Sequence, residues 1–122
     1  MEAQARPQRF GRAMRLARRP DFLTVQERGR RVSGSSYLLL ALPHRAPVDA
    51  PITRLGITVS KKVGKAVERN RVKRWVRESY RRLADLAPPG LDVVVVARPA
   101  ALASGYRGTT AELRGLLRRL GR

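Results

Sequence analysis

The segment KKVGKAVERNRVKRWVRESYRR, residues 61–82, carries Lys or Arg at nearly every second position and still repeats small and apolar residues with helical spacing. These residues recur at i, i+4, i+7 and i+11: Val72, Val76, Ser79 and Leu83. The pattern predicts a helix over about residues 66–84 with one face to bury. At 100° per residue the opposite face holds polar and basic side chains: Asn70, Lys73, Arg74, Arg77 and Arg81. Such a helix packs on a hydrophobic layer and presents cations to the outside.

Strands are predicted on both sides of this helix. Residues 53–60, TRLGITVS, alternate apolar and polar side chains, which is typical of a half-buried strand. Residues 91–98, LDVVVVAR, form a continuous apolar run, which is typical of a strand buried on both faces. Residues 32–43 read as one further extended strand, with a short strand before it as an alternative. We expect it to pair with 53–60 as a hairpin across the Pro-rich loop 43–51.

Shorter helices are expected near the two ends. RPDFLTVQERG (19–29) has Pro in its first turn and Gly at its end, as helix termini favour. Residues 109–122 read as a last helix in which Thr109 and Glu112 form a capping box. The order of elements predicts one α+β domain over residues 15–122, a mixed sheet packed by helices. A basic, flexible tail is expected at residues 1–14.

The net charge of +18, from 27 basic and 9 acidic residues, destabilises the folded chain by self-repulsion unless a polyanion is nearby. Nucleic acid is the leading candidate and an anionic membrane surface comes second. The absence of cysteine excludes disulfides and thiolate metal sites. No apolar run approaches the roughly 20 residues of a membrane span, and the N-terminal residues lack the apolar stretch of a signal peptide. We therefore expect a cytoplasmic protein with no membrane partner.

The acidic residues do not suggest catalysis by this chain. No two carboxylates stand at a metal-ligand spacing beside a histidine, and His44 is alone in the Pro-rich loop. We expect no catalytic residue and no metal ligand in the chain. A binding site is predicted instead in the loop that leads into the basic helix, where anions are favoured: Ser60, Lys61, Lys62 and Lys65.

Two aromatic side chains allow two interpretations. Phe22 and Tyr37 belong either to the core, as single aromatics more often do, or to a platform on which unpaired bases stack. Trp75 is interpreted as packing at the edge of the apolar stripe. The residues alone do not decide whether Phe22 and Tyr37 belong to the core or to a stacking platform.

The motif ERNRVKRWVRESYRR resembles the signature helix of the protein subunit of bacterial ribonuclease P. RLARRPDFLTVQERG resembles the first helix of that family, and RLGITVSKKVGKAVERNR resembles its strand and basic loop. The family's remaining elements also have counterparts here, in the same order: SYLLLAL, LDVVVVAR and the terminal Leu/Arg helix. The resemblance therefore covers about residues 15–120. It implies a four-stranded mixed sheet in the order αβββαβα, like domain 2 of ribosomal protein S5. Its strand–helix–strand crossover is left-handed, against the general rule.

The resemblance also implies a function. The family's protein binds a catalytic RNA, expected here at 1:1, that removes the 5′ leader of precursor tRNA with Mg²⁺ held by the RNA. A cleft between the first helix and the sheet holds the leader. Two rivals remain: a general ribosomal or RNA-chaperone protein, and a stand-alone basic nuclease.

Residue by residue, Arg69, Asn70 and Arg71 match the motif that docks on the catalytic RNA, and Lys73, Arg74 and Arg77 extend that face. In a helix Arg69 and Arg71 point about 200° apart, so they cannot grip one phosphate as a simple pair. Phe22 matches the first aromatic of the leader cleft and Tyr37 an aromatic on the sheet. Gln26 stands where the family often has a second aromatic, which would weaken base stacking there.

Overall fold

A computed structural model describes residues 15–16, 19–43 and 53–121. Three helices and four strands follow in the expected order αβββαβα: α1 (Arg19–Arg28), β1 (Arg30–Ser33), β2 (Tyr37–Pro43), β3 (Arg54–Val59), α2 (Ala66–Leu83), β4 (Leu91–Ala97) and α3 (Ala101–Leu120). Short 3-10 turns, η2 (Lys61–Val63) and η3 (Ala84–Leu86), flank α2. The predicted tail at 1–14 and the loop with His44 lie outside the described residues. The α+β class and the basic helix are confirmed.

The strands form one mixed sheet in the order β1-β2-β4-β3. β4 runs antiparallel to β2 and parallel to β3, so the predicted hairpin between 32–43 and 53–60 is wrong. The reason lies in the most apolar strand of the chain. Val93, Val94 and Val95 are at most 1% exposed, and a strand covered on both faces is most stable between two neighbours rather than at an edge.

The stretch 32–43 is not one continuous strand: the short strand allowed before it is β1, which ends at Ser33, and β2 begins at Tyr37. The chain turns at residues 34–36, and Val32 on β1 then lies opposite Leu39 on β2. Glu112 of α3 holds this turn, because its carboxylate accepts hydrogen bonds from the backbone N–H groups of Tyr37 (2.7 Å) and Ser36 (3.0 Å). The predicted capping box is therefore wrong: α3 is kinked at Gly105, and both Thr109 and Glu112 lie within the helix that follows the kink.

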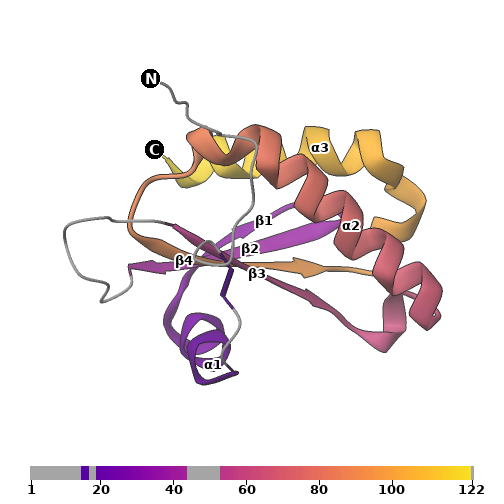
Figure 1. Ribbon diagram of the computed structural model, residues 1–122, viewed down its shortest axis with the longest axis horizontal. Coiled ribbons are helices and arrows are strands. Elements are labelled where there is room, and N and C mark those ends of the chain that lie inside the picture. The colour runs from indigo at the N-terminus through magenta and orange to yellow at the C-terminus, as the bar shows by residue number, and fades with distance from the viewer. Residues whose placement is uncertain (1–14, 17–18, 44–52, 122) are drawn as a thin grey trace.

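Helices cover both faces of the sheet. α2 and α3 lie side by side on one face, and α1 lies on the other (Figure 1). The face toward α2 and α3 buries alternate residues of the central strands, Tyr37, Leu39, Ala41, Val93 and Val95. The intervening positions, Leu38, Leu40 and Val94, form a second cluster with Leu16 and Val25 under α1. Alternation along the strands therefore divides the core into two layers.

The residues before α1 add to the edge of the sheet. Arg15 bridges Leu55 in parallel, and the N–H of Leu16 donates to the carbonyl oxygen of Leu55 at 2.8 Å. This contact covers the first half of β3, whose other neighbour is β4. The second half of β3 leads through η2 into α2.

Candidate RNA-binding surface

The start of α2 is fixed by its own side chains. The Glu68 carboxylate accepts the backbone N–H of Lys65 at 2.8 Å, which satisfies one of the free donors at the helix N-terminus. Arg69 reaches back in the same direction, and its Nη1 donates to the carbonyl oxygen of Gly64 at 2.9 Å. These two bonds set the course of the loop, which exposes a hydroxyl and three ammonium groups: Ser60, Lys61, Lys62 and Lys65.

α2 buries the predicted stripe and exposes the predicted basic face. Val72, Val76 and Ser79 are 0% exposed. Asn70, Arg71, Arg74 and Arg77 are exposed, and Lys73 and Arg69 are half-buried. Arg69 and Arg71 differ as their spacing predicts, since Arg69 turns to the loop and Arg71 to solvent. Most cations of the segment therefore share one solvent-facing surface, as a polyanion would require.

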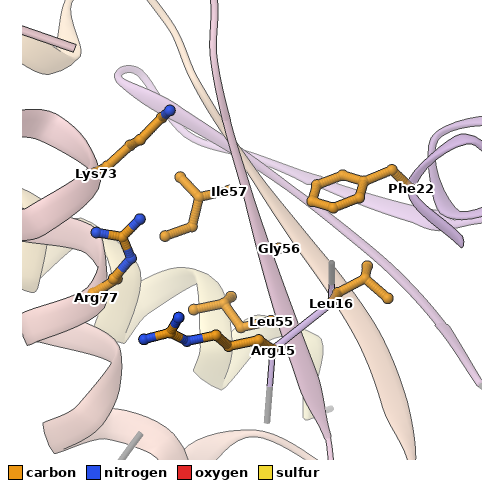
Figure 2. A pocket seen from close by; sticks show the side chains of 8 residues that line it. All are labelled: Arg15, Leu16, Phe22, Leu55, Gly56, Ile57, Lys73 and Arg77. Atoms are coloured by element: carbon orange, nitrogen blue, oxygen red, sulfur yellow. The ribbon is translucent and has the colours of Figure 1, made fainter. Parts of the chain in front are cut away.

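A hollow of about 240 Å³ joins this basic surface to α1. Figure 2 shows β3 running through it, with Phe22 approaching from α1 on one side and Lys73 and Arg77 from α2 on the other. The remaining lining is Arg15, Leu16, Leu55, Gly56 and Ile57. The hollow thus combines an aromatic ring, apolar strand atoms and cations.

Gly56 makes room for the aromatic ring. A Cβ atom at this position would lie 2.5 Å from Cζ and 2.7 Å from Cε1 of Phe22, closer than carbon atoms approach. The ring therefore rests directly on the backbone of β3, half-buried. Any larger side chain at residue 56 would displace it.

Tyr37 does not belong to this hollow, and its assignment to the leader cleft is wrong. It is 0% exposed beneath α3, and its hydroxyl forms a 2.7 Å hydrogen bond with Thr109. Burial is the main cause that raises the pKa of the Tyr37 phenol. Because Tyr37 has the same strand parity as Leu39 and Ala41, it faces α2 and α3 and cannot meet a ligand under α1.

An ion-pair cluster holds α1 against the sheet. Arg54 on β3 donates from Nε and Nη2 to the two carboxylate oxygens of Asp92 on β4, each at 2.8 Å. Its Nη2 also lies 3.7 Å from Asp21 of α1, the neighbour of Phe22. The hydrogen bonds with Asp92 are the main cause that raises the pKa of Arg54. The cluster therefore positions the α1 side of the hollow.

Within the described ranges, no three His, Cys, Asp or Glu side chains are grouped so that they could hold a metal ion. None of the helices described here is both long and apolar enough to cross a membrane.

Sequence reasoning missed part of the lining. Arg15, Gly56 and Ile57 reach the hollow only through the alignment of residues 15–16 with β3 and the passage of α1 over that strand. Gly56 gave a usable signal, since a glycine inside an alternating strand often marks a close approach of another group. Nothing in the local sequence signals the contact of Arg15.

Comparisons with known proteins agree with the architecture and the motifs. The family model for Ribonuclease P matches residues 10–121. A "Ribonuclease P protein component" from Desulfovibrio desulfuricans is 44% identical over 113 residues, covering 91% of this chain and 85% of that relative. One from Streptomyces avermitilis is 44% identical over 112 residues, covering 87% of this chain and 90% of that relative.

Solved structures extend this similarity to three dimensions. The RNase P protein from Thermotoga maritima superposes with a TM-score of 0.75 at 34% identity, covering 86% of this chain and 96% of that one. The RNase P protein from Staphylococcus aureus gives a TM-score of 0.76 at 28% identity, covering 88% of this chain and 95% of that one. By fold, by motif and by sequence along nearly its whole length, the chain belongs to the family of ribonuclease P protein components.

Proposed function

We propose that this chain binds the catalytic RNA of ribonuclease P and the 5′ leader of precursor tRNA, and so assists removal of the leader. The observation that carries the proposal is the hollow in which Phe22 of α1 and Lys73 and Arg77 of α2 line one space across β3. A single-stranded leader needs both kinds of contact, an apolar surface for bases and cations for phosphates. Membership of the family supports the identity of the two RNA partners.

The two surfaces divide the work in this proposal. The exposed loop lysines and the solvent-facing arginines of α2 bind the backbone of the catalytic RNA, where each arginine can grip a phosphate through two N–H groups. The hollow binds the leader, with a base resting against Phe22 and a phosphate between Lys73 and Arg77. Lys73 and Arg77 border both surfaces, so binding of one RNA would pre-order the side chains that hold the other.

We assign the chemical step to the RNA partner, with Mg²⁺ held by that RNA. The role of the chain is then to bind and orient the leader, so that it acts as an enzyme only within a 1:1 ribonucleoprotein of the cytoplasm. Three acidic groups of the described residues have other uses in the fold. Asp92 pairs with Arg54, Glu68 holds the loop before α2, and Glu112 holds the turn before β2.

Leader cleavage at low Mg²⁺ tests the proposal. A precursor tRNA is mixed with a bacterial ribonuclease P RNA, with and without the chain, and the chain alone serves as control. Cleavage at the mature 5′ end only when both are present supports the proposal. Tight binding to many RNAs without stimulation would favour a general RNA-binding protein instead. Cleavage by the chain alone would overturn the assignment of the chemistry to RNA.

A further inference from the structure

The two helices on one face of the sheet run in the same direction and touch along their length (Figure 1). The hydroxyl groups of Ser79 on α2 and Thr110 on α3 are hydrogen-bonded at 2.7 Å. Seven residues beyond Ser79, the carbonyl of Leu86 lies near Gly121, eleven residues beyond Thr110. The outer faces of the helices therefore form one continuous surface, away from the sheet.

Arginines border the line where α2 and α3 meet. Three residues after Ser79 comes Arg82, and four residues after Thr110 comes Arg114, so each turns from the contact toward solvent. The same faces hold Arg71 on α2 and Arg107 and Arg118 on α3. We call these five exposed residues the arginine seam: Arg71, Arg82, Arg107, Arg114 and Arg118.

Side-chain hydrogen bonds and ion pairs among the described residues engage several arginines of the protein but none of the arginine seam. Arg54 pairs with Asp92, Arg98 donates to the carbonyl of Gly34, and Arg119 donates to the carbonyl of Ser33. In the part of the chain that is described, no hydrogen bond or ion pair joins a seam arginine to another residue.

Nearby acids do not neutralise the seam. Glu78 is on the outer side of α2 but pairs with Arg81 at 2.6 Å. Glu112 points the other way and accepts the N–H groups of Ser36 and Tyr37. Arg114 and Arg118 stand at i and i+4 on one helix, where like charges destabilise a helix by a few tenths of a kcal/mol. A bound polyanion would reverse the sign of this interaction.

We propose that the arginine seam extends the RNA-binding surface of α2 onto α3 and grips the backbone of a double-helical RNA segment. Arg107 to Arg118 spans eleven residues, or about 16 Å of helix, and the axes of packed helices lie about 8–10 Å apart. Two such rows of cations fit two phosphate strands across a groove, whereas a single strand would need one row. Helical RNA is read through its shape and backbone, which suits side chains without apolar partners. The inference rests on the proposed function only in taking RNA as the ligand.

The test removes the α3 row and matches the charge elsewhere. Arg107→Gln, Arg114→Gln and Arg118→Gln are combined in one variant, and Gln has a helix propensity close to that of Arg. The control combines Arg19→Gln, Arg28→Gln and Arg31→Gln, three exposed arginines of α1 and β1 with the same loss of charge. Because none of these six arginine side chains forms a hydrogen bond or ion pair with another described residue, the thermal midpoint without RNA should not fall.

Binding is measured at several salt concentrations with two probes, a 20-base-pair RNA hairpin stem and a bacterial ribonuclease P RNA. The α3 variant should bind the stem at least tenfold more weakly than the control variant. Its log–log salt slope should fall by about 2, at roughly 0.7–0.9 per lost phosphate contact. Equal affinities and slopes for the two variants would overturn the inference. So would a selective loss of binding to phosphatidylserine vesicles with RNA binding unchanged, because it would make the seam a membrane surface.

The outcome is separable from that of the proposed function. Stimulation of leader cleavage by the unaltered chain tests the proposed function and does not depend on the stem. If the chain stimulates cleavage but the two variants bind RNA alike, only the seam is refuted. If the stem is bound through the seam but the unaltered chain does not stimulate cleavage, only the proposed role in leader removal is refuted.

Discussion

Arg69 donates from Nη1 to the carbonyl oxygen of Gly64 at 2.9 Å, so one of the two arginines of the motif at residues 69–71 supports the loop that precedes it. Arg71, two residues later, is exposed and makes no such bond to a described residue. The two arginines are therefore not equivalent. Arg69 positions the lysines of the loop in addition to any phosphate that it meets, and Arg71 is available to RNA alone.

This difference predicts different effects for two substitutions. Arg71→Ala should lower the log–log salt slope of catalytic-RNA binding by about 0.7–0.9, the value for one phosphate contact. Arg69→Ala should cost more affinity, because the loop with Lys61, Lys62 and Lys65 also loses its support, and should lower the free energy of unfolding by about 1 kcal/mol. Salt titrations and urea unfolding measure both quantities. Identical results for the two variants would remove Arg69 from its positioning role.

Gly56→Ala should disturb leader binding by moving the Phe22 ring. The new Cβ would overlap Cζ of Phe22, so the ring must leave its place on β3. We expect binding of precursor tRNA to weaken relative to mature tRNA, by up to the roughly 1–3 kcal/mol of one base–aromatic contact. The ratio of the two dissociation constants is the measurement.

Gly115→Ala supplies the matched control for that experiment. An added Cβ at Gly115 meets nothing within 4 Å, and the residue lies in α3. This substitution should stabilise the protein by up to about 1 kcal/mol and leave the precursor-to-mature ratio unchanged. A change in the ratio with Gly115→Ala, or none with Gly56→Ala, would contradict the role assigned to Phe22.

Arg54→Met should leave Asp92 without its partner. The Asp92 side chain is 9% exposed and accepts both hydrogen bonds from Arg54. Loss of the Arg54 guanidinium should therefore lower the free energy of unfolding by about 2 kcal/mol, as for hydrogen bonds to charged groups. Asp21→Asn should cost less than about 1 kcal/mol, because its contact with Arg54 is 3.7 Å long and both side chains are near 30% exposed. Chemical denaturation distinguishes the two; equal costs would mean that Asp21 contributes as much as the buried pair.

Stability should fall at alkaline pH through a buried phenol. Burial raises the pKa of Tyr80 to about 12, above the ordinary value of 10.0. The unfolded chain therefore releases this proton first. The contribution of Tyr80 is complete below pH 10 and is lost between pH 10 and about 12, by roughly 1.4 kcal/mol per pH unit. Unfolding curves of Tyr80→Phe should show a shallower alkaline loss than the unaltered chain, with Tyr37 accounting for part of what remains.

The sequence predicts those parts of the fold that depend on local periodicity. The helix over 66–84 and the buried strand at 91–98 are confirmed, because each pattern extends over many residues. Pairing between strands depends on distant residues. β2 and β3 are neighbours in sequence, which favours a hairpin. The apolar β4 lies between them instead, because a central position covers both of its faces.

The errors at Tyr37 and Glu112 have one physical cause. Parity along β2 places Tyr37 with Leu39, but parity does not reveal which face α1 covers. The spacing of Thr109 and Glu112 fits a capping box, yet α3 is kinked at Gly105 and Thr109 already lies within its longer second part. The Glu112 carboxylate accepts its hydrogen bonds from the turn before β2, which is distant in sequence, and not from the N-terminus of its own helix. Local sequence patterns therefore identify these side chains as notable but do not predict which distant residues they contact.

The central place of β4 also determines when this protein can fold during its synthesis. β2 and β3 do not pair with each other, and each needs β4, which ends at Ala97. Until the ribosome has released those residues, the first three strands and the basic helix have no complete sheet to pack on. The most cationic segment of the chain therefore emerges before its scaffold exists, within reach of the ribosome's own RNA.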